Sequence, residues 1–509
     1  MKIAIAGAGV SGFATLGYLV EHLREMPSVE AVIYLLQPPR EIRLDNLTAP
    51  QRDRLTQLKA IGIDPSQLYG GGQVYHPVQP SLFTFNGNSA ARGFNFALGR
   101  YDSNDYFEWI QANRGLLASL YPDFAPEKQQ QRHGGHTLDD IEGTTPRGAY
   151  GLYLHEQFLA LQAHLPEHIT LHTVPEALHT FAAYPSQANS HTELPITVET
   201  ETRQLVVDYL VDATGHRYAK LRPEWAGRVF GAYPCDRYGQ NNLPKEITVV
   251  GAGPAGIEVA LHALHNLSVE CVTLVSHRAQ ARLPQIEPTE RYECQWLTRE
   301  KMRCQPTAAY AEVLLQKELE TCYKACNLPY SGWDSLFEID DYPRFLSDYL
   351  KSTESSSNHP LAHLVRPVMS FYGQVKDLLS PAQQIELQQL INRVRPLFAT
   401  QSRPCAELML AALKADRLKL MAGEFLLDQP TPTILQPDGT QIHPSCVILA
   451  TGFAPSMPAV YSQVVNNTSC YQVLGTSLSE VHRRAANVAE AIHTIAARDA
   501  MIAQHPSFF

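Results

Sequence analysis

A glycine-rich turn near the start of the chain constrains its fold more than any other feature. Residues 2–12 read KIAIAGAGVSG, so a short apolar run leads directly into the pattern G-x-G-x-x-G. The apolar run is typical of a buried parallel strand. A helix is predicted to follow, because apolar side chains recur at helical spacing at Val10, Phe13, Leu16, Leu19, Val20 and Leu23.

Each position of this turn has a physical role in binding a dinucleotide. Gly7 permits the tight turn, Gly9 lets a pyrophosphate approach the main chain, and Gly12 lets the helix pack closely on the strand. The first N–H groups of the helix, at Val10 and Ser11, would face the phosphates together with the positive end of the helix dipole. The strand–turn–helix context therefore predicts a dinucleotide site; a glycine-rich turn that holds no ligand is the alternative.

The residue expected to bind the adenosine ribose departs from the usual pattern. Residues 31–36, AVIYLL, predict the second strand of the unit. An acidic residue normally ends this strand and binds the ribose hydroxyls, but Gln37 stands here. Because an amide can donate and accept hydrogen bonds, Gln37 remains a candidate ribose ligand. The identity of the nucleotide is left open at this point.

The opening motif occurs a second time. Residues 246–256 read EITVVGAGPAG and lead into another helical pattern. This internal repeat supports both copies, since two independent accidents would otherwise be required. The residues of the second copy predicted to bind a dinucleotide are Gly251, Gly253, Pro254, Ala255 and Gly256.

The end of the next strand indicates which nucleotide the second copy prefers. Residues 270–275 predict a strand that is followed by Ser276 and Arg278. The Arg278 guanidinium can bind a 2′-phosphate, and no acid at the strand end would repel one. The pattern favours NADPH over NADH; a surface arginine in a loop is the alternative.

The rest of the chain is organised around these two units. Residues 1–240 are expected to form the first part of one domain, residues 241–445 a second domain, and residues 446–509 a return to the first. Helical patterns predict an insertion at about 285–415 in the second domain. The predicted class is α/β, with two Rossmann-like, three-layer dinucleotide-binding domains and a helical insertion.

Composition and charge exclude several classes of partner. A net charge of −10 without a basic tract argues against nucleic acid or an anionic membrane surface. No apolar run approaches the roughly 18 residues that span a bilayer, so no transmembrane segment is expected. Nine cysteines without a C-x-x-C pair fit a reducing cytoplasm. His133 and His136 have no further ligands nearby, and no metal site is predicted.

Two further segments complete a specific combination. Asp212-Ala213-Thr214-Gly215 precedes the second glycine turn, and Ala450-Thr451-Gly452 lies near the end of the chain. Together with the two turns they resemble the flavoproteins with two dinucleotide-binding domains, which include flavin monooxygenases and disulfide-reductase-like enzymes. The resemblance implies FAD in the first unit, NAD(P)H in the second, and crossovers between domains at Thr214, Gly215, Thr451 and Gly452. The redox cysteine pair of the disulfide reductases is absent.

A narrower resemblance rests on shorter motifs. The segment G-G-x-x-Y ending at Tyr75, Asn86 in an aromatic loop, Trp109 and Arg147 are similar to FAD/NAD(P)-binding proteins that stand beside the lysine and ornithine N-hydroxylases. We expect Tyr75 to contact the cofactor. Asn86 and Arg147 are the candidate catalytic residues, although Asn86 could belong to a plain turn and Arg147 could cap a helix. Trp109 is expected in the core.

These features lead to one functional hypothesis and two alternatives. The hypothesis is an FAD-dependent, NADPH-using monooxygenase that uses O₂ to hydroxylate a small molecule, with an amine or amino acid suggested by the resemblance alone. One alternative is an FAD-dependent reductase or dehydrogenase that does not oxygenate. The other is a redox sensor that binds FAD without turnover. His482, near the start of the last predicted helix, is expected at the surface.

Overall fold

The structure is a computed structural model that describes most of the chain. The described residues are 1–84, 95–96, 105–122, 145–183, 195–215, 221–239, 243–284, 292–337, 339–352, 359–398, 401–451, 470–473 and 478–504. They form two compact units. Unit 1 comprises Met1–Lys220, Tyr233–Arg237 and Phe453–Phe509, and unit 2 comprises Leu221–Ala232 and Tyr238–Gly452.

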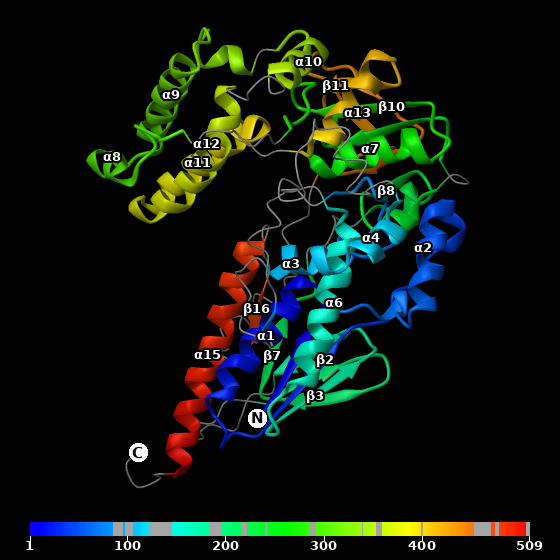
Figure 1. The fold of residues 1–509 in the computed structure, drawn as a ribbon, viewed down its shortest axis with the longest axis vertical. Coiled ribbons are helices and arrows are strands. Elements are labelled where there is room, and N and C mark those ends of the chain that lie inside the picture. Colours follow the sequence, from blue (N-terminus) through cyan, green and yellow to red (C-terminus); the bar gives the residue numbers. More distant parts are fainter. Residues whose placement is uncertain are drawn as a thin grey trace. The chain divides into compact units, whose positions relative to one another are not determined.

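Unit 1 is built on a five-stranded parallel sheet with the order β16-β7-β1-β2-β3 (Figure 1). Its central strand pairs with β2 from Lys2↔Val32 to Ala6↔Leu36 and with β7 on its other side. The strands are β1 (Lys2–Ala6), β2 (Ala31–Leu36), β3 (Ile169–Val174), β7 (Tyr209–Asp212) and β16 (Cys470–Gln472). The apolar runs of the first two strands are thus buried in the middle of a parallel sheet, as predicted.

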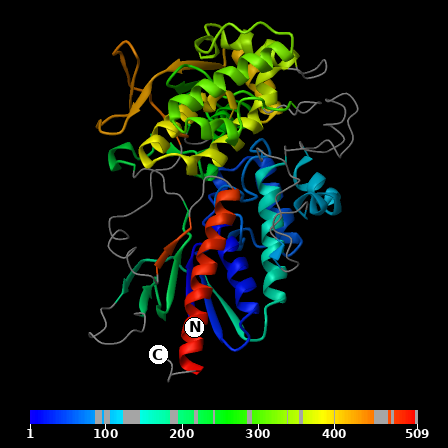
Figure 2. The ribbon, with the colours of Figure 1, turned by 90° about the vertical axis from the view of Figure 1, so that its left-hand side faces the viewer.

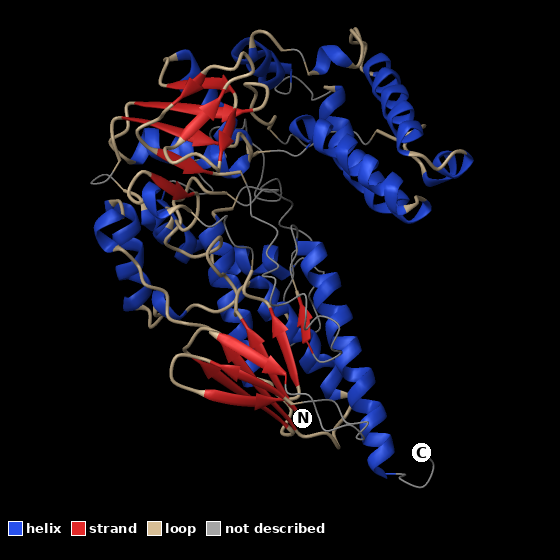
Figure 3. Cartoon of the chain, turned by 180° about the vertical axis from the view of Figure 1, so that it is seen from behind, coloured by secondary structure: helices blue, strands red, loops and turns tan. Residues whose placement is uncertain are grey.

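Helices cover one face of this sheet and a small antiparallel sheet covers the other (Figure 3). Ile3 and Ile5 of β1 pack in the core that the helices α1 (Val10–Arg24), α6 (Arg147–Ala163) and α15 (Leu478–Gln504) share. The intervening Ala4 packs with residues of β4 (Thr180–Ala183), β5 (Ile196–Glu199) and β6 (Gln204–Val207). The two-residue alternation of a strand produces this three-layer arrangement.

Shorter helices complete unit 1. They are η1 (Leu44–Asn46), α2 (Ala49–Ala60), η2 (Pro65–Gln67), α3 (Asp105–Ala112), α4 (Arg114–Leu120) and η7 (Cys235–Arg237). The long helix α15 lies beside α1, at the opposite end of the sequence, in both views (Figure 1, Figure 2). None of the described helices combines the length and apolar character that a membrane crossing requires.

Unit 2 repeats the architecture of unit 1. Its parallel sheet has the order β11-β10-β9-β15-β8, and β9 is central. The strands are β8 (Val229–Gly231), β9 (Glu246–Val250), β10 (Cys271–Ser276), β11 (Leu418–Ala422) and β15 (Val447–Leu449). The other elements are η6 (Pro223–Trp225), α7 (Pro254–Asn266), α13 (Arg403–Lys414), β12 (Glu424–Leu426), β13 (Thr433–Leu435) and β14 (Gln441–Ile442). The helices α7 and α13 pack on the parallel strands.

A helical insertion lies between β10 and β11 (Figure 1). It contains α8 (Arg299–Cys304), α9 (Ala308–Ala325), η8 (Asp334–Leu336), α10 (Tyr342–Ser352), α11 (Pro360–Val375), η9 (Lys376–Leu378) and α12 (Pro381–Phe398). Its core is mostly apolar and contains the fully buried Glu318. That carboxylate accepts hydrogen bonds from the Tyr292 hydroxyl at 2.6 Å and from the N–H groups of Trp296 and Leu297 at 2.7 and 2.8 Å, which fixes the entry segment of the insertion.

The two sheets correspond strand by strand. From one edge to the other, β3-β2-β1-β7-β16 matches β11-β10-β9-β15-β8. Along the chain, the fifth strand of each sheet comes directly after the fourth strand of the other sheet. In this way β8 of unit 2 follows β7 of unit 1, and β16 of unit 1 follows β15 of unit 2. The compact units place residues 221–232 in unit 2, and the chain belongs to unit 1 again from residue 453. The domain boundaries at residues 240 and 445 stay a prediction.

Candidate functional site

The first glycine turn has room for main chain alone. Gly7 has a φ of +95°, and a Cβ there would lie 2.4 Å from the carbonyl oxygen of Ala213. A Cβ at Gly12 would lie 1.8 Å from the carbonyl oxygen of Gly7. Both distances are far below van der Waals contact. The first and third glycines are therefore required by the close approach of β1, α1 and the segment after β7.

The start of α1 offers hydrogen-bond donors to a ligand. Helix geometry leaves the N–H groups of Val10, Ser11 and Gly12 without an acceptor inside the helix. The first helical bond of this turn runs from the Phe13 N–H to the Gly9 carbonyl at 2.9 Å, and no side chain caps the end. Val10 and Ser11 are only half-buried. This cradle fits the pyrophosphate of a dinucleotide.

A second glycine segment, residues 70–72, lies against the first turn. The Gly70 N–H donates to the Ala8 carbonyl at 2.7 Å, and a Cβ at Gly9 would lie 3.5 Å from the Cα of Gly72. Gly72 has a φ of +55° and is exposed. The two glycine segments therefore meet through main-chain atoms, which leaves the first turn accessible to phosphates.

Tyr75 is held in place behind this segment. A Cβ at Gly151 of α6 would lie 1.8 Å from the Tyr75 carbonyl oxygen, so α6 carries a glycine where the loop crosses it. The Tyr75 ring contacts Tyr150 edge to face, with ring centroids 5.1 Å apart. The structure brings Tyr75 into the loop that runs over the first turn. Its contact with a cofactor stays a prediction.

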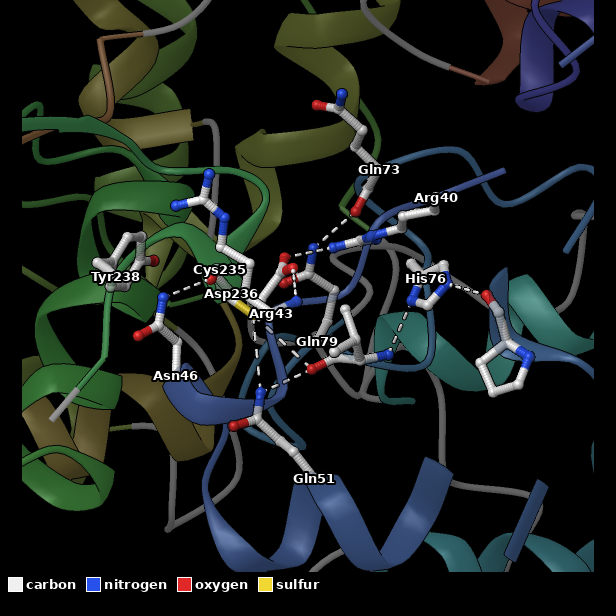
Figure 4. Close-up of polar contacts among 12 residues, drawn as sticks. Arg40, Arg43, Asn46, Gln51, Gln73, His76, Gln79, Cys235, Asp236 and Tyr238 are labelled. Carbon is white, nitrogen blue, oxygen red and sulfur yellow. Dashed lines mark hydrogen bonds and ion pairs between the residues drawn. The ribbon is translucent and has the colours of Figure 1, made fainter. Parts of the chain in front are cut away.

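The end of β2 carries an arginine that the sequence analysis did not assign. Gln37 donates from Nε2 to the Leu68 carbonyl at 2.8 Å. Arg40 forms an ion pair with the fully buried Asp236, Nη2 to Oδ1, at 2.6 Å (Figure 4). Arg40 Nη1 is buried and has no hydrogen-bond partner among the described residues. A donor thus stands at the ribose end of the first nucleotide unit, where the usual acid is missing.

Backbone contacts fix the neutral form of His76 beside this pair (Figure 4). Its Nε2 lies 2.7 Å from the Pro65 carbonyl and must donate, whereas Nδ1 accepts from the Val78 N–H at 3.0 Å. Burial, and then the charge of Arg40, hold the pKa of His76 well below its usual value. His76 therefore orders the loop around residues 65–79, and both of its ring nitrogens are committed to main chain.

The first crossover segment follows β7 directly. The Asp212 carboxylate accepts from the Thr214 N–H at 3.0 Å and from its hydroxyl at 2.7 Å. Gly215 has a φ of +83°. This turn lies next to Gly7 through Ala213, so Thr214 and Gly215 stand at the edge of the first cradle.

Arg147 is the first residue of α6 and contacts protein groups on two sides. Its Nε donates to the Thr84 carbonyl at 2.9 Å, and its guanidinium also binds the Tyr233 hydroxyl. Its N–H donates to the Phe83 carbonyl at 2.8 Å. These contacts agree with the structural alternative for Arg147, and a catalytic role stays a prediction. Asn86 lies outside the described residues, as do His133 and His136.

The second glycine turn reproduces the first in detail. Gly251 has a φ of +106°, and a Cβ there would lie 2.6 Å from the Ala450 carbonyl oxygen. A Cβ at Gly256 would lie 1.7 Å from the Gly251 carbonyl oxygen. Pro254 occupies the first position of α7, where its missing N–H is not needed, and Ala255 follows it. Thr451 follows this turn's Ala450 and is exposed, whereas Gly452 lies outside the described residues.

An arginine lies over the second glycine of this turn. A Cβ at Gly253 would lie 3.4 to 3.5 Å from the guanidinium of Arg282. The main chain of Arg282 is anchored, because its carbonyl accepts from Gln401 Nε2 at 2.6 Å and from the Tyr342 hydroxyl at 3.4 Å. Arg282 therefore places a positive charge at the expected pyrophosphate position. The sequence contains no local signal for this contact, because the partners come from α10 and the segment before α13.

Ser276 and Arg278 lie where the strand-end prediction placed them. The Ser276 hydroxyl accepts from the Gln280 N–H and donates to its carbonyl, both at 3.0 Å. Arg278 is exposed and lies 5.0 Å from the centre of the Phe337 ring. Gln280 Nε2 in turn donates to the Phe337 carbonyl at 3.0 Å. The helical insertion thus supports the loop that carries Arg278.

Two aromatic expectations have different outcomes. Trp109 is buried, and its indole N–H donates to Glu156 at 2.7 Å, so its placement in the core is confirmed. The expected surface placement of His482 is wrong, since it is 7% exposed and its Nδ1 lies 3.0 Å from the Tyr18 hydroxyl. Its partner lies on α1, which a local sequence pattern could not reveal.

All nine cysteines are described, and all are free thiols. The two in unit 1 are Cys235 and Cys470. Burial raises the pKa of the Cys235 thiol to about 12, with a further contribution from Asp236, and burial raises that of Cys470 to about 11. These thiols stay protonated at neutral pH and are poor nucleophiles.

Family models match two overlapping parts of the chain. Residues 4–217 match the FAD-NAD(P)-binding family, and residues 179–313 match the pyridine nucleotide-disulphide oxidoreductase family. Together they cover both glycine turns. No curated protein matches the chain.

Several solved structures are similar over almost the whole length. The chain is 10% identical to an ornithine hydroxylase from Pseudomonas aeruginosa, with a TM-score of 0.44 and coverage of 97% of this chain and 98% of that one. It is 12% identical to an L-lysine 6-monooxygenase from Pseudomonas syringae (TM-score 0.41, coverage 98% and 99%). It is 10% identical to a thioredoxin reductase from Lactococcus lactis (TM-score 0.38, coverage 96% and 97%). The roles of individual residues rest on the geometry of this chain.

Proposed function

We propose that this chain, in which residues 4–217 match the FAD-NAD(P)-binding family and residues 179–313 the pyridine nucleotide-disulphide oxidoreductase family, is an NADPH-using flavin monooxygenase that hydroxylates a small molecule. The observation that carries the proposal is the duplicated cradle. Each unit joins a glycine turn, the positive end of a helix and a crossover alanine in the same geometry. Two such cradles in one chain suit a pair of dinucleotides of different function.

We assign FAD to unit 1 and NADPH to unit 2. In unit 1 the N–H groups at the start of α1, and the buried Arg40 Nη1, which has no hydrogen-bond partner among the described residues, would provide donors for a nucleotide. In unit 2, Arg282 lies over the glycine turn and Arg278 at the end of β10. Arg282 suits the pyrophosphate and Arg278 the extra 2′-phosphate of NADPH, because guanidinium groups bind phosphate in a fork geometry.

FAD and NADPH, when bound, would supply the hydride transfer and the reactivity toward O₂ that the protein side chains lack. The protein's part is to bind, orient and exclude water. The Val10 and Ser11 N–H groups would hold the flavin phosphates, and Gly9 and Gly72 would keep the path beside them free of side chains. Asn86 and Arg147 remain our candidates for contacts near the reacting groups.

The cysteines favour this chemistry over disulfide reduction. A dithiol centre requires two cysteines close together near the flavin, at least one of them with a lowered pKa. Cys235 and Cys470 of unit 1 are free, and the pKa of each is raised. The disulphide chemistry in the name of the second family therefore has no counterpart in unit 1.

Rapid-mixing spectroscopy tests the proposal against its alternatives. Purified protein loaded with FAD is reduced anaerobically with NADPH and then mixed with O₂. A monooxygenase is expected to give a transient absorbance distinct from oxidised and reduced flavin. Direct reoxidation without that transient would favour the reductase alternative. Failure of NADPH to bleach the flavin would favour the sensor.

The substrate class is proposed from the resemblance to N-hydroxylases, so it is tested separately. Ornithine, lysine and simple alkyl amines are each incubated with enzyme, NADPH and ¹⁸O₂. Incorporation of one labelled oxygen, with NADPH consumption matched to product, would identify an amine substrate. Oxygenation of a different class of small molecule would retain the monooxygenase and reject the amine.

A further inference from the structure

Two histidines and a carboxylate meet where the end of α1 packs against α15. His22 lies in the last turn of α1, Glu25 caps that helix, and His493 lies on α15. One ligand atom from each residue can be chosen so that all three lie within 4.8 Å of one another. The centres of the two imidazole rings are 5.2 Å apart, with the ring planes inclined by 34°.

These three side chains are not used elsewhere in the described structure. Neither imidazole nor the Glu25 carboxylate forms a hydrogen bond or ion pair with another described residue. His22 contributes only its carbonyl, which accepts from the Glu25 N–H at 3.2 Å. Both histidines are half-buried and Glu25 is exposed, so the site is partly shielded and still open to solvent.

The chemistry of the group is that of a transition-metal site. Two imidazoles and one carboxylate are the ligand set with which proteins hold Zn²⁺ when a fourth position is left to water. Oxygen-preferring ions such as Mg²⁺ and Ca²⁺ suit it poorly. The last carbonyls of α1 also point toward this end of the helix and carry partial negative charge, which favours a cation there.

We propose that His22, Glu25 and His493 bind a divalent transition-metal ion, Zn²⁺ or one of similar ligand preference, that clamps α15 to α1. The spacing on α1 supports the geometry, because residues three positions apart lie on one helix face. With a rise of 1.5 Å per residue, His22 lies about 18 Å along the helix from Val10. The ion is therefore distinct from the cofactor cradle, and the proposal does not depend on the proposed function.

Zinc titration of the full-length protein tests the site. Protein dialysed against a chelator is titrated with ZnCl₂ in a calorimeter, and the same is done for His22→Asn, His493→Asn and Glu25→Gln. The histidine variants are expected to lose at least tenfold in Zn²⁺ affinity, and Glu25→Gln several-fold. His179→Asn is the matched control, because His179 is an exposed histidine of unit 1 outside the cluster. It should bind Zn²⁺ as the unaltered protein does.

Two further measurements keep the proposal testable if a variant folds poorly. Zn²⁺ at a hundredfold excess over its dissociation constant should raise the melting midpoint of the unaltered protein by about 5 °C, and that of His493→Asn by much less. Electron paramagnetic resonance with one equivalent of Cu²⁺ should report two nitrogen ligands, and one in each histidine variant. Equal Zn²⁺ affinity in the unaltered protein and both histidine variants, or a Cu²⁺ spectrum unchanged by those substitutions, would overturn the site.

Discussion

At the scale of single residues, the carbonyl oxygen of Gly7 determines what position 12 can hold. Gly12→Ala would put a Cβ 1.8 Å from that oxygen, so either the turn or the start of α1 must move. The N–H groups aimed at the phosphates would then lose their alignment. We expect FAD retention on purification to fall at least tenfold, measured by the ratio of flavin to protein absorbance.

The control for this prediction is Gly115→Ala. Gly115 lies in α4, and a Cβ there would meet nothing within 4 Å. Because alanine favours helix over glycine by about 0.5–1 kcal/mol, this variant should keep its flavin and be slightly more stable. Full flavin content in Gly12→Ala would show that the first turn does not hold FAD.

The two arginines of unit 2 should have separable effects on cofactor choice. Arg278 lies at the strand end, where only the 2′-phosphate of NADPH would reach. Arg278→Ala should therefore lower kcat/KM for NADPH about 10- to 100-fold and leave kcat/KM for NADH unchanged. Arg282 lies over Gly253, where a pyrophosphate common to both cofactors would bind. Arg282→Ala should lower kcat/KM for flavin reduction by similar factors with NADPH and with NADH.

The opposite pattern would reverse the two assignments. If Arg282→Ala changed the preference between NADPH and NADH while Arg278→Ala did not, Arg282 would be the residue that reads the 2′-phosphate. Lys301→Ala is a suitable charge control, because Lys301 lies in the helical insertion over the ring of Trp296 and not at the turn.

Sequence reasoning succeeded for residues whose requirement is local. Gly12 is required by the Gly7 carbonyl of the same turn, Gly7 adopts the positive φ that the glycine pattern predicts, and Trp109 belongs to a helix with a clear apolar face. It missed Arg40 and misplaced His482, because their partners Asp236 and Tyr18 are distant along the chain. A polar residue in a short motif does not indicate which remote segment will bury it.

At the scale of elements, a single buried arginine joins α2 to the loop at residues 77–81. Arg54 is 1% exposed and lies 4.0 Å from the centre of the Tyr121 ring. It donates to four acceptors: the carbonyl oxygens of Pro77, Gln79 and Leu120 and the hydroxyl of Ser81. This loop follows directly from the segment that carries Tyr75 and His76, so Arg54 supports the floor of the first cradle.

We expect Arg54→Met to lower the free energy of unfolding by about 3 kcal/mol or more, because it leaves several buried acceptors without donors. Arg52→Met on the same helix is the control. Arg52 is exposed, so its replacement should change the free energy of unfolding by less than about 1 kcal/mol. Urea unfolding measures both. Equal effects of the two substitutions would contradict the role given to Arg54.

The elements themselves were predictable to different degrees. The central strands and the helices α1 and α7 carry strong periodic signals, and the structure confirms two α/β units of the Rossmann type. The strands β8 and β16 are three residues each, too short for a periodic signal. They belong to their sheets only because β8 pairs with β15 and β16 pairs with β7. The sequence therefore could not show that the fifth strand of each sheet follows the fourth strand of the other sheet along the chain.

At the scale of the whole molecule, buried neutral histidines should determine how stability depends on mild acid. His76 in unit 1 and His262 in unit 2 are both almost fully buried. Burial, with a contribution from Arg40, holds the pKa of His76 well below 6.5, and burial lowers that of His262 to about 3. The unfolded chain takes up protons at these groups below pH 6.5 and the folded chain does not. Stability is therefore present above pH 6.5 and lost as the pH falls below it.

The loss of unfolding free energy caused by these histidines has a definite size and a definite pH range. His262, whose pKa in the folded chain is about 3, contributes 1.36 kcal/mol per pH unit, or about 2 kcal/mol between pH 6.5 and 5. The Thr200 hydroxyl and neighbouring donors lower the pKa of the Glu176 carboxyl to about 2, so its contribution is lost only below about pH 4.5. Urea unfolding at pH 8, 6.5 and 5 isolates the histidines. In His262→Leu the fall in unfolding free energy of unit 2 between pH 6.5 and 5 should shrink by about 2 kcal/mol, whereas replacement of the exposed His179 by leucine should leave it unchanged. An identical fall in His262→Leu and the unaltered protein would mean that His262 is protonated in the folded state, against the burial that surrounds it.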